Sequence, residues 1–278
     1  MTHDDCQPDA HSAAQNAAAG TPGTSGKTEL AALLTRISWD MPGARVEQES
    51  FARIEALCGP VRNRLTPDQW HVARRLIHTT ADLSLGDQLV FRHDPVQSGV
   101  QALQRGANIV CDSRMIRAGL SLARLRQCHP RYTETSLICH AADSDVAREA
   151  AQRGCTRALC AMEKTHALGE LEGALVLIGN APLALARLCR FILEEQVRPA
   201  LVVGMPVGFV NVLEAKELLA FCPVPHIVLE GRRGGSPLAV ATLHALTEVV
   251  LEERTQDMPS SQAPRAAQAS RTSQDLQG

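Results

Sequence analysis

The stretch Gly173-Ala174-Leu175-Val176-Leu177-Ile178-Gly179-Asn180-Ala181-Pro182 decides the fold that we predict for this chain. Its first six residues are an apolar run that is typical of a strand buried on both faces of a parallel sheet. Gly179 and Pro182 then mark a tight turn into a helix, which we expect over 182–195. A buried strand that leads directly into a long helix indicates an α/β fold.

Four more short apolar runs flank this segment, and amphipathic helical patterns alternate with them. We expect strands at 108–111, 136–139, 173–178, 200–203 and 226–229. These runs predict a five-stranded, mainly parallel sheet inside a three-layer α/β/α fold, because helical crossovers cover both faces of such a sheet. The segment 83–91 fits a helix or a strand, and its pattern leaves that choice open.

The region before the first strand is predicted to be helical. Thr66 and Gln69 make a capping box around Pro67, which is a strong helix start. An apolar face follows at helical spacing through Val72, Ala73, Leu76 and Ile77. The same pattern places His78 in the last turn of this helix.

His78 has two interpretations at this stage. A histidine near a helix C-terminus commonly caps the last carbonyl groups, where the helix dipole favours positive charge. Imidazole groups in general also exchange protons near neutral pH, which suits them to acid–base catalysis. The helix end favours a protonated ring, whereas the guanidinium groups of Arg74 and Arg75 disfavour it, and the sequence leaves the balance open.

Composition argues against several classes of protein. The 278 residues are 45% hydrophobic, carry a net charge of −2 and include only 3% aromatic residues. A nucleic-acid-binding protein usually has a large basic excess and aromatic stacking residues, so this class is disfavoured. Only three basic residues are lysine and the rest are arginine, which suits a ligand with several carboxylates or phosphates. A GC-rich genome explains the same bias equally well.

The nine cysteines and the two ends of the chain indicate a soluble cytoplasmic protein. There is no Cys-x-x-Cys motif, and the closest pair, Cys155 and Cys160, matches no zinc pattern, so a reducing compartment is expected. We also see no signal peptide and no apolar run long enough to span a membrane. Residues 1–27 and 255–278 are polar and aperiodic, so we expect disordered tails around a folded domain over 36–254.

Three glycine-rich turns follow predicted strands, at 179–182, 204–210 and 231–236. In open α/β sheets, ligands bind beyond the carboxyl ends of the strands, where these turns would gather. The last turn places Arg232 and Arg233 at a helix start, which is a ready anion site. Each turn alone is also explained by the backbone angles that glycine permits. Motifs for a dinucleotide, a P-loop, a nucleophile elbow or a zinc protease are missing, which favours acid–base or positioning catalysis.

These motifs together resemble the precorrin-8X methylmutase family of cobalamin biosynthesis. The matching segments, in family order, are Glu49-Ser50-Phe51, Arg75-Leu76-Ile77-His78-Thr79-Thr80-Ala81-Asp82, Cys111-Asp112 with Met115, Thr156-Arg157, Gly179-Asn180-Ala181-Pro182, Gly204-Met205-Pro206-Val207-Gly208-Phe209-Val210, and Gly231-Arg232 with Gly234-Gly235-Ser236. Leu183 and Asn211 depart from the usual family pattern. The resemblance covers nearly the whole predicted core.

The resemblance implies an isomerase that shifts a methyl group from C-11 to C-12 of precorrin-8X, or of cobalt-precorrin-8, to give hydrogenobyrinate or cobyrinate. It implies His78 as the catalytic proton donor, no external cofactor, no metal site and a homodimer with the ligand near the subunit interface. The implied substrate-binding residues are Ser50, Arg75, Thr79, Asp112, Ser113, Arg157, Asn180, Gly208, Arg232, Gly234 and Ser236. A tetrapyrrole carrier without turnover and an unrelated small-anion binder are the alternatives.

Overall fold

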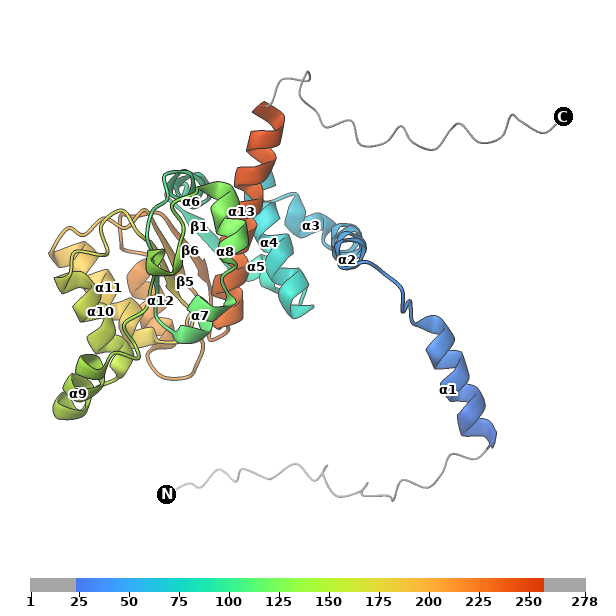
Figure 1. Cartoon of the computed structure of the whole chain (residues 1–278), viewed down its shortest axis with the longest axis horizontal. Coiled ribbons are helices and arrows are strands. Elements are labelled where there is room, and N and C mark those ends of the chain that lie inside the picture. Colours follow the sequence, from blue (N-terminus) through green and yellow to red (C-terminus); the bar gives the residue numbers. More distant parts are fainter. Residues whose placement is uncertain (1–23, 258–278) are drawn as a thin grey trace, which may run out of the picture. The chain divides into compact units, whose positions relative to one another are not determined.

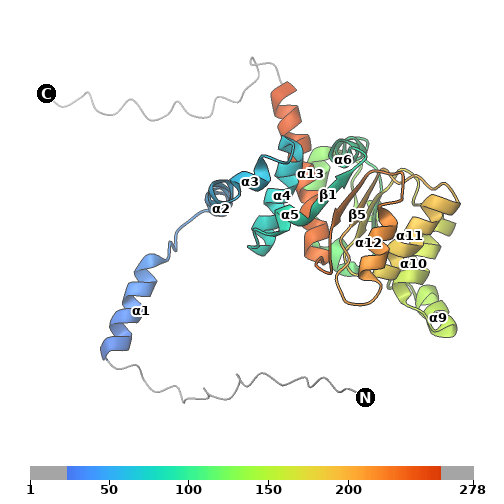
Figure 2. The ribbon, with the colours of Figure 1, turned by 180° about the vertical axis from the view of Figure 1, so that it is seen from behind.

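The computed structural model describes residues 24–257, which Figures 1 and 2 show from opposite sides. Contacts divide the chain into two units, one ending at Gln48 and one beginning at Glu49. The predicted disordered tails lie largely outside the described residues. Their inner ends differ from the prediction, because helix α1 (Thr24–Arg36) includes residues 24–27 and helix α13 (Ser236–Asp257) includes residues 255–257.

The second unit is built on a six-stranded sheet, one strand more than predicted. The strands are β1 (Leu89–Arg92), β2 (Ile109–Cys111), β3 (Leu137–Ile138), β4 (Leu175–Ile178), β5 (Leu201–Gly204) and β6 (His226–Leu229). Their spatial order is β1-β6-β5-β4-β2-β3, and all neighbours run parallel except β1 and β6. The predicted α/β class and mainly parallel sheet are therefore confirmed, and each of the five predicted strands is present.

The additional strand comes from the segment that the sequence left open. It divides into a single helical turn, α5 (Leu85–Gln88), and the edge strand β1. Strand β1 pairs antiparallel with β6, with Leu89 opposite Leu229. This pairing satisfies the outer backbone groups of β6, and the partners lie far apart in sequence. A local sequence pattern could not show this long-range pairing, so the prediction of five strands missed β1.

Side chains of the central strand alternate between two cores, one on each face of the sheet. Leu175 and Leu177 join one apolar cluster, whereas Val176 and Ile178 join the other. All four are fully buried, and each contributes on the order of 2 kcal/mol by leaving water. This alternation is the physical basis of the three-layer arrangement.

Helices from different parts of the chain cover the two faces. One layer contains α4 (Pro67–Thr80), α6 (Pro95–Gln104), α7 (Arg114–Gly119), α8 (Leu122–Cys128) and α13. The other contains α10 (Arg157–Ala167), α11 (Pro182–Glu194) and α12 (Val212–Leu219). The remaining helices are α2 (Gly43–Leu57), which crosses the boundary between the units, α3 (Gly59–Arg62), α9 (Ser144–Arg153) and the 3₁₀ turn Glu134–Ser136. In Figure 1, α10 and α11 lie on one side of the strands and α13 on the other.

Helix α4 begins as the sequence predicts. The Thr66 side chain accepts a hydrogen bond from the Gln69 amide, and the Gln69 side chain accepts one from the Thr66 amide. The helix ends at Ala81, which adopts a left-handed conformation with a φ of 55°. His78 therefore stands in the last turn, as predicted. Among residues 24–257, none of the helices has the length and apolar character needed to cross a membrane.

Candidate active site

Loops after five strands meet at the carboxyl edge of the parallel part of the sheet. They follow β2, β3, β4, β5 and β6. Parallel strands place all their carboxyl ends at the same edge, so segments up to 120 residues apart become neighbours there. Two pockets lie at this edge.

The larger pocket has a volume of about 640 Å³. Its lining residues are Asp112, Ser113, Arg114, Ala141, Ala142, Thr156, Arg157, Ala158, Asn180, Ala181, Pro182, Leu183, Val210 and Asn211. Leu183 and Asn211, the two departures from the family pattern, are both among the residues that line this pocket. The guanidinium-bearing side chains of Arg114 and Arg157 are exposed, and both line the same cavity. The pocket is thus suited to an anionic ligand with an apolar body.

Asp112 organises one wall of this pocket. Its Oδ2 accepts hydrogen bonds from the backbone amides of Asn180 (2.8 Å) and Ala181 (2.7 Å), which hold the turn into α11. Burial raises the pKa of this carboxyl, and the amide hydrogen bonds only partly oppose the rise. Its Oδ1 is buried and has no hydrogen-bond partner among the described residues.

The smaller pocket, of about 360 Å³, lies against α4, α7 and α13. It is lined by Arg75, Thr79, Met115, Gly119, Ser236, Pro237, Val240, Ala241 and His244. Ser113 of the larger pocket and Ser236 of the smaller one share a hydrogen bond of 3.0 Å between their hydroxyl oxygens. The two pockets therefore adjoin at this serine pair.

His78 is half-buried, directly before Thr79 and about one helical turn after Arg75, two residues of the smaller pocket, but it lines neither cavity itself. Its Nδ1 lies 2.7 Å from the hydroxyl of Ser50 on α2. The ring of Phe51 meets the imidazole edge to face, with 5.2 Å between ring centroids. Nε2 makes no hydrogen bond within the described residues, so it is the nitrogen left for a ligand. These contacts fix the ring while leaving one nitrogen available.

Arg75 is held beneath His78 by a buried charge cluster. Its guanidinium is ion-paired with Glu248 on α13, which also binds Arg124 (2.8 Å) and His71 (3.1 Å). Burial alone would raise the pKa of Glu248, but the His71 hydrogen bond and the two guanidinium groups outweigh it and hold that pKa below its usual value. The cluster ties α13 to α4 and α8.

The neighbouring His244 is a neutral imidazole. Burial, reinforced by Arg124 and Arg75, lowers the pKa of His244 to about 4. Its Nε2 accepts a hydrogen bond from the Ser121 amide at 3.1 Å, so the proton of the neutral ring sits on Nδ1. His244 thus offers the smaller pocket an uncharged imidazole.

The glycine turns allow close backbone packing. A side chain at Gly234 would clash with the carbonyl oxygen of Met205, 2.2 Å from the position of a Cβ atom, and one at Gly179 would clash with the Ser236 backbone. Gly208 has a φ of 143° and donates its amide to the Arg232 carbonyl at 3.2 Å. The turns after β4, β5 and β6 therefore support one another.

The buried ammonium group of Lys216 fastens the last of these turns. It donates to the carbonyl oxygens of Gly231 and Arg233, both at 2.7 Å. Burial lowers the pKa of Lys216 to about 8. Arg233 in turn forms an ion pair with Asp82 and a 3.0 Å hydrogen bond with Ser84, so this turn is joined to the segment that follows α4.

The structure distributes the sequence-predicted site residues over four groups. Asp112, Ser113, Arg157 and Asn180 line the larger pocket, and Arg75, Thr79 and Ser236 line the smaller one. Ser50 and His78 form the hydrogen-bonded pair beside the smaller pocket. Gly208, Arg232 and Gly234 line neither pocket and belong to the packed turns.

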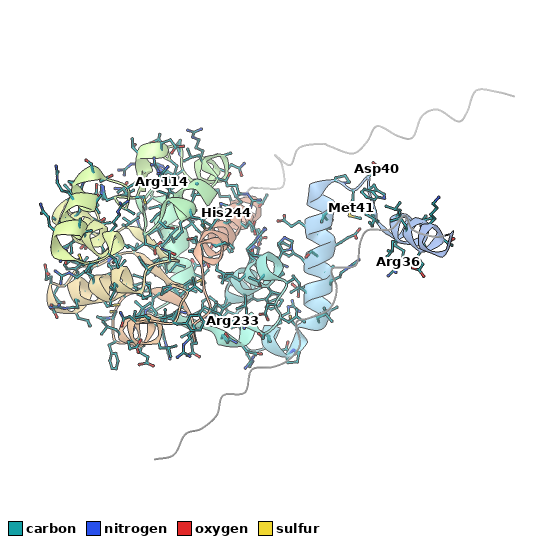
Figure 3. The ribbon with its side chains drawn as sticks, turned by 90° about the horizontal axis from the view of Figure 1, so that it is seen from below. Arg36, Asp40, Met41, Arg114, Arg233 and His244 are labelled. Atoms are coloured by element: carbon teal, nitrogen blue, oxygen red, sulfur yellow. The ribbon has the colours of Figure 1, made fainter. Side chains whose placement is uncertain are left out.

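Two charged or polar lining residues escaped the sequence analysis. Arg114 directly follows the strand-end residues Asp112 and Ser113, so its position was a usable signal. His244 lies in the middle of a long helix, where nothing local distinguishes it from a core position. Figure 3 labels both, together with Arg233, and shows that they come from separate elements.

The fold and the two adjoining pockets define an α/β protein whose sheet has, at its carboxyl edge, cavities suited to an anionic small molecule. Comparison with known proteins identifies the class further. The family model for precorrin-8X methylmutase (CbiC) matches residues 45–249. A solved structure, precorrin-8X methyl mutase from Thermus thermophilus, superposes with a TM-score of 0.69 at 42% identity, over 76% of this chain and 98% of that one.

Two relatives agree with this match. The cobalt-precorrin-8 methylmutase of Leptospira interrogans is 37% identical over 73% of this chain and 92% of its own length. The precorrin-8X methylmutase of Pseudomonas aeruginosa is 37% identical over 76% and 97%. The chain belongs to the precorrin-8X methylmutase family, whose members are isomerases of cobalamin biosynthesis that catalyse a methyl migration on a corrinoid precursor. The comparisons lend no support to the alternative of a non-catalytic carrier.

Proposed function

We propose that this protein moves a methyl group from C-11 to C-12 of precorrin-8X, or of its cobalt form, with His78 as the proton donor. The hydrogen bond between Ser50 and His78 is the observation that carries the proposal. It orients the imidazole and leaves Nε2 for the substrate. A proton or hydrogen bond from Nε2 to a ring nitrogen would draw electron density through the conjugated system and favour the migration.

The Ser50 hydroxyl suits both states of such a donor. It can donate to a neutral Nδ1, which places the ring proton on Nε2, or accept from Nδ1 when the ring is charged. The ring therefore keeps its orientation through a proton-transfer cycle. Phe51 restricts the imidazole from a second side, so the donor is held in place before the substrate binds.

Two adjoining pockets fit a large, flat molecule with several carboxylates. Arg114 and Arg157 are exposed in the larger pocket and suit bidentate carboxylate binding. The Arg232 side chain is also exposed on the neighbouring turn. We assign the smaller pocket, with Arg75 and Thr79, to the part of the macrocycle nearest His78. The predicted homodimer and the cytoplasmic location belong to this proposal as well.

The test is conversion of precorrin-8X and of cobalt-precorrin-8 by purified wild-type protein and by His78→Ala. We expect a chromophore shift to the orange corrin with wild type and a loss of at least a hundredfold in rate with the variant. His166→Ala is the matched control, because His166 on α10 pairs with Glu195 at the end of α11 and lines neither pocket.

Three results decide the proposal. Equal conversion by wild type and His78→Ala would remove His78 from the mechanism. Tight binding without conversion by wild type would favour a carrier. The ratio of rates with the two substrates shows whether the cobalt form is preferred, a question that relatives of equal identity leave open.

A further inference from the structure

Two cysteines stand in sulfur-to-sulfur contact at the start of α10. The Sγ atoms of Cys155 and Cys160 lie 3.3 Å apart, and both residues are reduced in the structure. Cys160 is fully buried, whereas Cys155 is partly exposed. The partial exposure of Cys155 distinguishes this pair from Cys189, which is fully buried and inaccessible to a reagent.

The position of the pair within the helix start explains its proximity. Thr156 is the N-cap of α10, and its hydroxyl accepts the Leu159 amide at 3.3 Å. Cys155 therefore precedes the cap and Cys160 is the fourth helical residue, which are the two positions of a hydrophobic staple. A staple normally joins two apolar side chains and sets the angle at which the chain enters the helix. Here the two side chains are thiols.

A guanidinium group lies beside this staple, and the two thiols differ in burial. Arg153 places its guanidinium 3.8 Å from the Cys160 sulfur, where a positive charge stabilises a thiolate. The same guanidinium lies between Glu149 and Glu163, so it takes the place that a metal ion would need among these acidic groups and Cys160. Burial and the adjacent Cys155 raise the pKa of Cys160 to about 11, which assigns the first attack to the more exposed Cys155.

We propose that Cys155 and Cys160 form a thiol–disulfide exchange site for low-molecular-weight disulfides such as oxidised glutathione. The Cys155 thiolate attacks one sulfur of glutathione disulfide, which gives a mixed disulfide and releases one glutathione. The Cys160 thiolate then attacks the Cys155 sulfur, forms the protein disulfide and releases the second glutathione. The two cysteines lose two protons and two electrons, and both are taken up by glutathione. Only about 1.3 Å of approach separates the two sulfurs from disulfide distance.

The exchange site flanks a segment of the wall of the larger pocket. Thr156 and Arg157, which line that pocket, lie inside the ring that the disulfide closes. Oxidation would therefore lock the backbone that carries the Arg157 guanidinium. This consequence uses only the position of the residues and is independent of the reaction that the pocket serves.

Peptide mapping tests the exchange site directly. The full-length protein is incubated at pH 8.5 with reduced and oxidised glutathione at several ratios, alkylated and digested with trypsin. Cleavage at Arg157 separates the two cysteines, so the disulfide is detected as peptides 154–157 and 158–164 joined together. We expect most of Cys155 in this linked species under oxidising ratios and none after addition of dithiothreitol.

Matched variants complete the test. Cys155→Ser must abolish the linked species, whereas Cys139→Ser, at another partly exposed cysteine, must leave it unchanged. We also expect amide hydrogen exchange over 156–161 to slow at least tenfold on oxidation of the wild type and to stay unchanged in Cys155→Ser. Separately alkylated cysteines at all ratios, or a glutathione adduct on Cys155 that never resolves to the linked species, would overturn the proposal.

Discussion

The hydroxyl oxygen of Ser50 lies 2.7 Å from Nδ1 of His78, although 28 positions separate the two residues in the chain. Packing of α2 beside α4 creates this contact, with Phe51 filling the space next to the imidazole. The guanidinium groups of Arg74 and Arg75 lie over the Phe51 ring at 4.4 and 4.9 Å from its centroid. A single turn of α2 thus orients the imidazole ring and makes cation–π contacts with Arg74 and Arg75.

Ser50→Ala should lower the methylmutase rate about fivefold without unfolding the protein. The reason is that one hydrogen bond contributes about 1 kcal/mol to ring orientation, and about 1.4 kcal/mol corresponds to a factor of ten in rate. The measurement is kcat under saturating substrate, with circular dichroism as the check of folding. Ser98→Ala, which removes a hydroxyl bound to the Asp94 carbonyl on α6, should keep the wild-type rate. A wild-type rate for Ser50→Ala would show that the ring needs no such support.

Asp112→Asn should raise the free energy of unfolding above that of the wild type at pH 7. This gain should be larger at pH 7 than at pH 4. Burial raises the pKa of Asp112 in the folded state. Between the pKa of the unfolded chain and that of the folded protein, the folded state therefore binds more protons than the unfolded chain. Wild-type stability therefore falls as pH rises through that window. An asparagine oxygen can still accept the Asn180 and Ala181 amides.

Urea unfolding of both proteins at pH 4, 5.5 and 7 measures this difference. Asp94→Asn, at an exposed position, should show no comparable trend. Asp112→Ala removes both hydrogen bonds and should destabilise the protein by about 2 kcal/mol. A pH-independent difference between Asp112→Asn and the wild type would mean that the buried carboxyl does not change its proton affinity on folding.

Glu248→Gln should destabilise the protein by about 3 kcal/mol at pH 7, because it removes the largely buried negative charge that faces Arg75, Arg124 and His71. The pKa of Glu248 is depressed in the folded state, so its stabilising contribution is present above the unfolded value of about 4.5 and disappears as pH falls through the folded value. The gap between variant and wild type should therefore close below pH 4. Denaturant titrations at pH 7 and pH 3.5 measure it, with Glu217→Gln at an exposed position of α12 as the neutral control.

Lys216→Met should reveal a pH dependence of stability that comes from a buried ammonium group. Burial lowers the pKa of Lys216 to about 8, below its unfolded value of 10.5, so the unfolded chain binds more protons between these values. Wild-type stability relative to the variant should therefore rise from pH 8 to about pH 10.5. The measurement is the difference in unfolding free energy at pH 7.5, 8.5 and 9.5.

Lys164→Met supplies the comparison for this lysine. The pKa of Lys164 is raised by hydrogen bonds to Asp143 and Asp145, so its contribution is lost only above the unfolded value. Its difference from wild type should stay level between pH 7.5 and 9.5. If Lys216→Met also stays level over this range, the ammonium group is not desolvated in the folded protein.

Local patterns in the sequence predicted much of this molecule. The five parallel strands and most helix starts depend on short apolar runs, prolines and caps, as the capping box of Thr66 and Gln69 shows. The position of His78 in the last turn of α4 follows from the same pattern. Strand β1 was missed because its identity depends on β6, about 140 positions away.

The pockets could be predicted only in part. Asp112, Ser113, Arg157 and Asn180 were found because they stand at strand or helix ends, where parallel topology gathers residues. His244 gave no such signal, since it becomes a pocket residue only when α13 packs against α4. The staple of Cys155 and Cys160 was visible as a close pair, but its sulfur contact was not.

The sequence by itself determined the α/β class, the order of the main elements and the turns that end at the ligand edge, because these depend on interactions between residues near one another in the chain. Only the tertiary structure decided which nitrogen of His78 is held by Ser50, which acid holds Arg75, and how two pockets adjoin at Ser113 and Ser236. Those relationships depend on contacts between distant segments, whose geometry is set by packing of the whole core rather than by any local pattern.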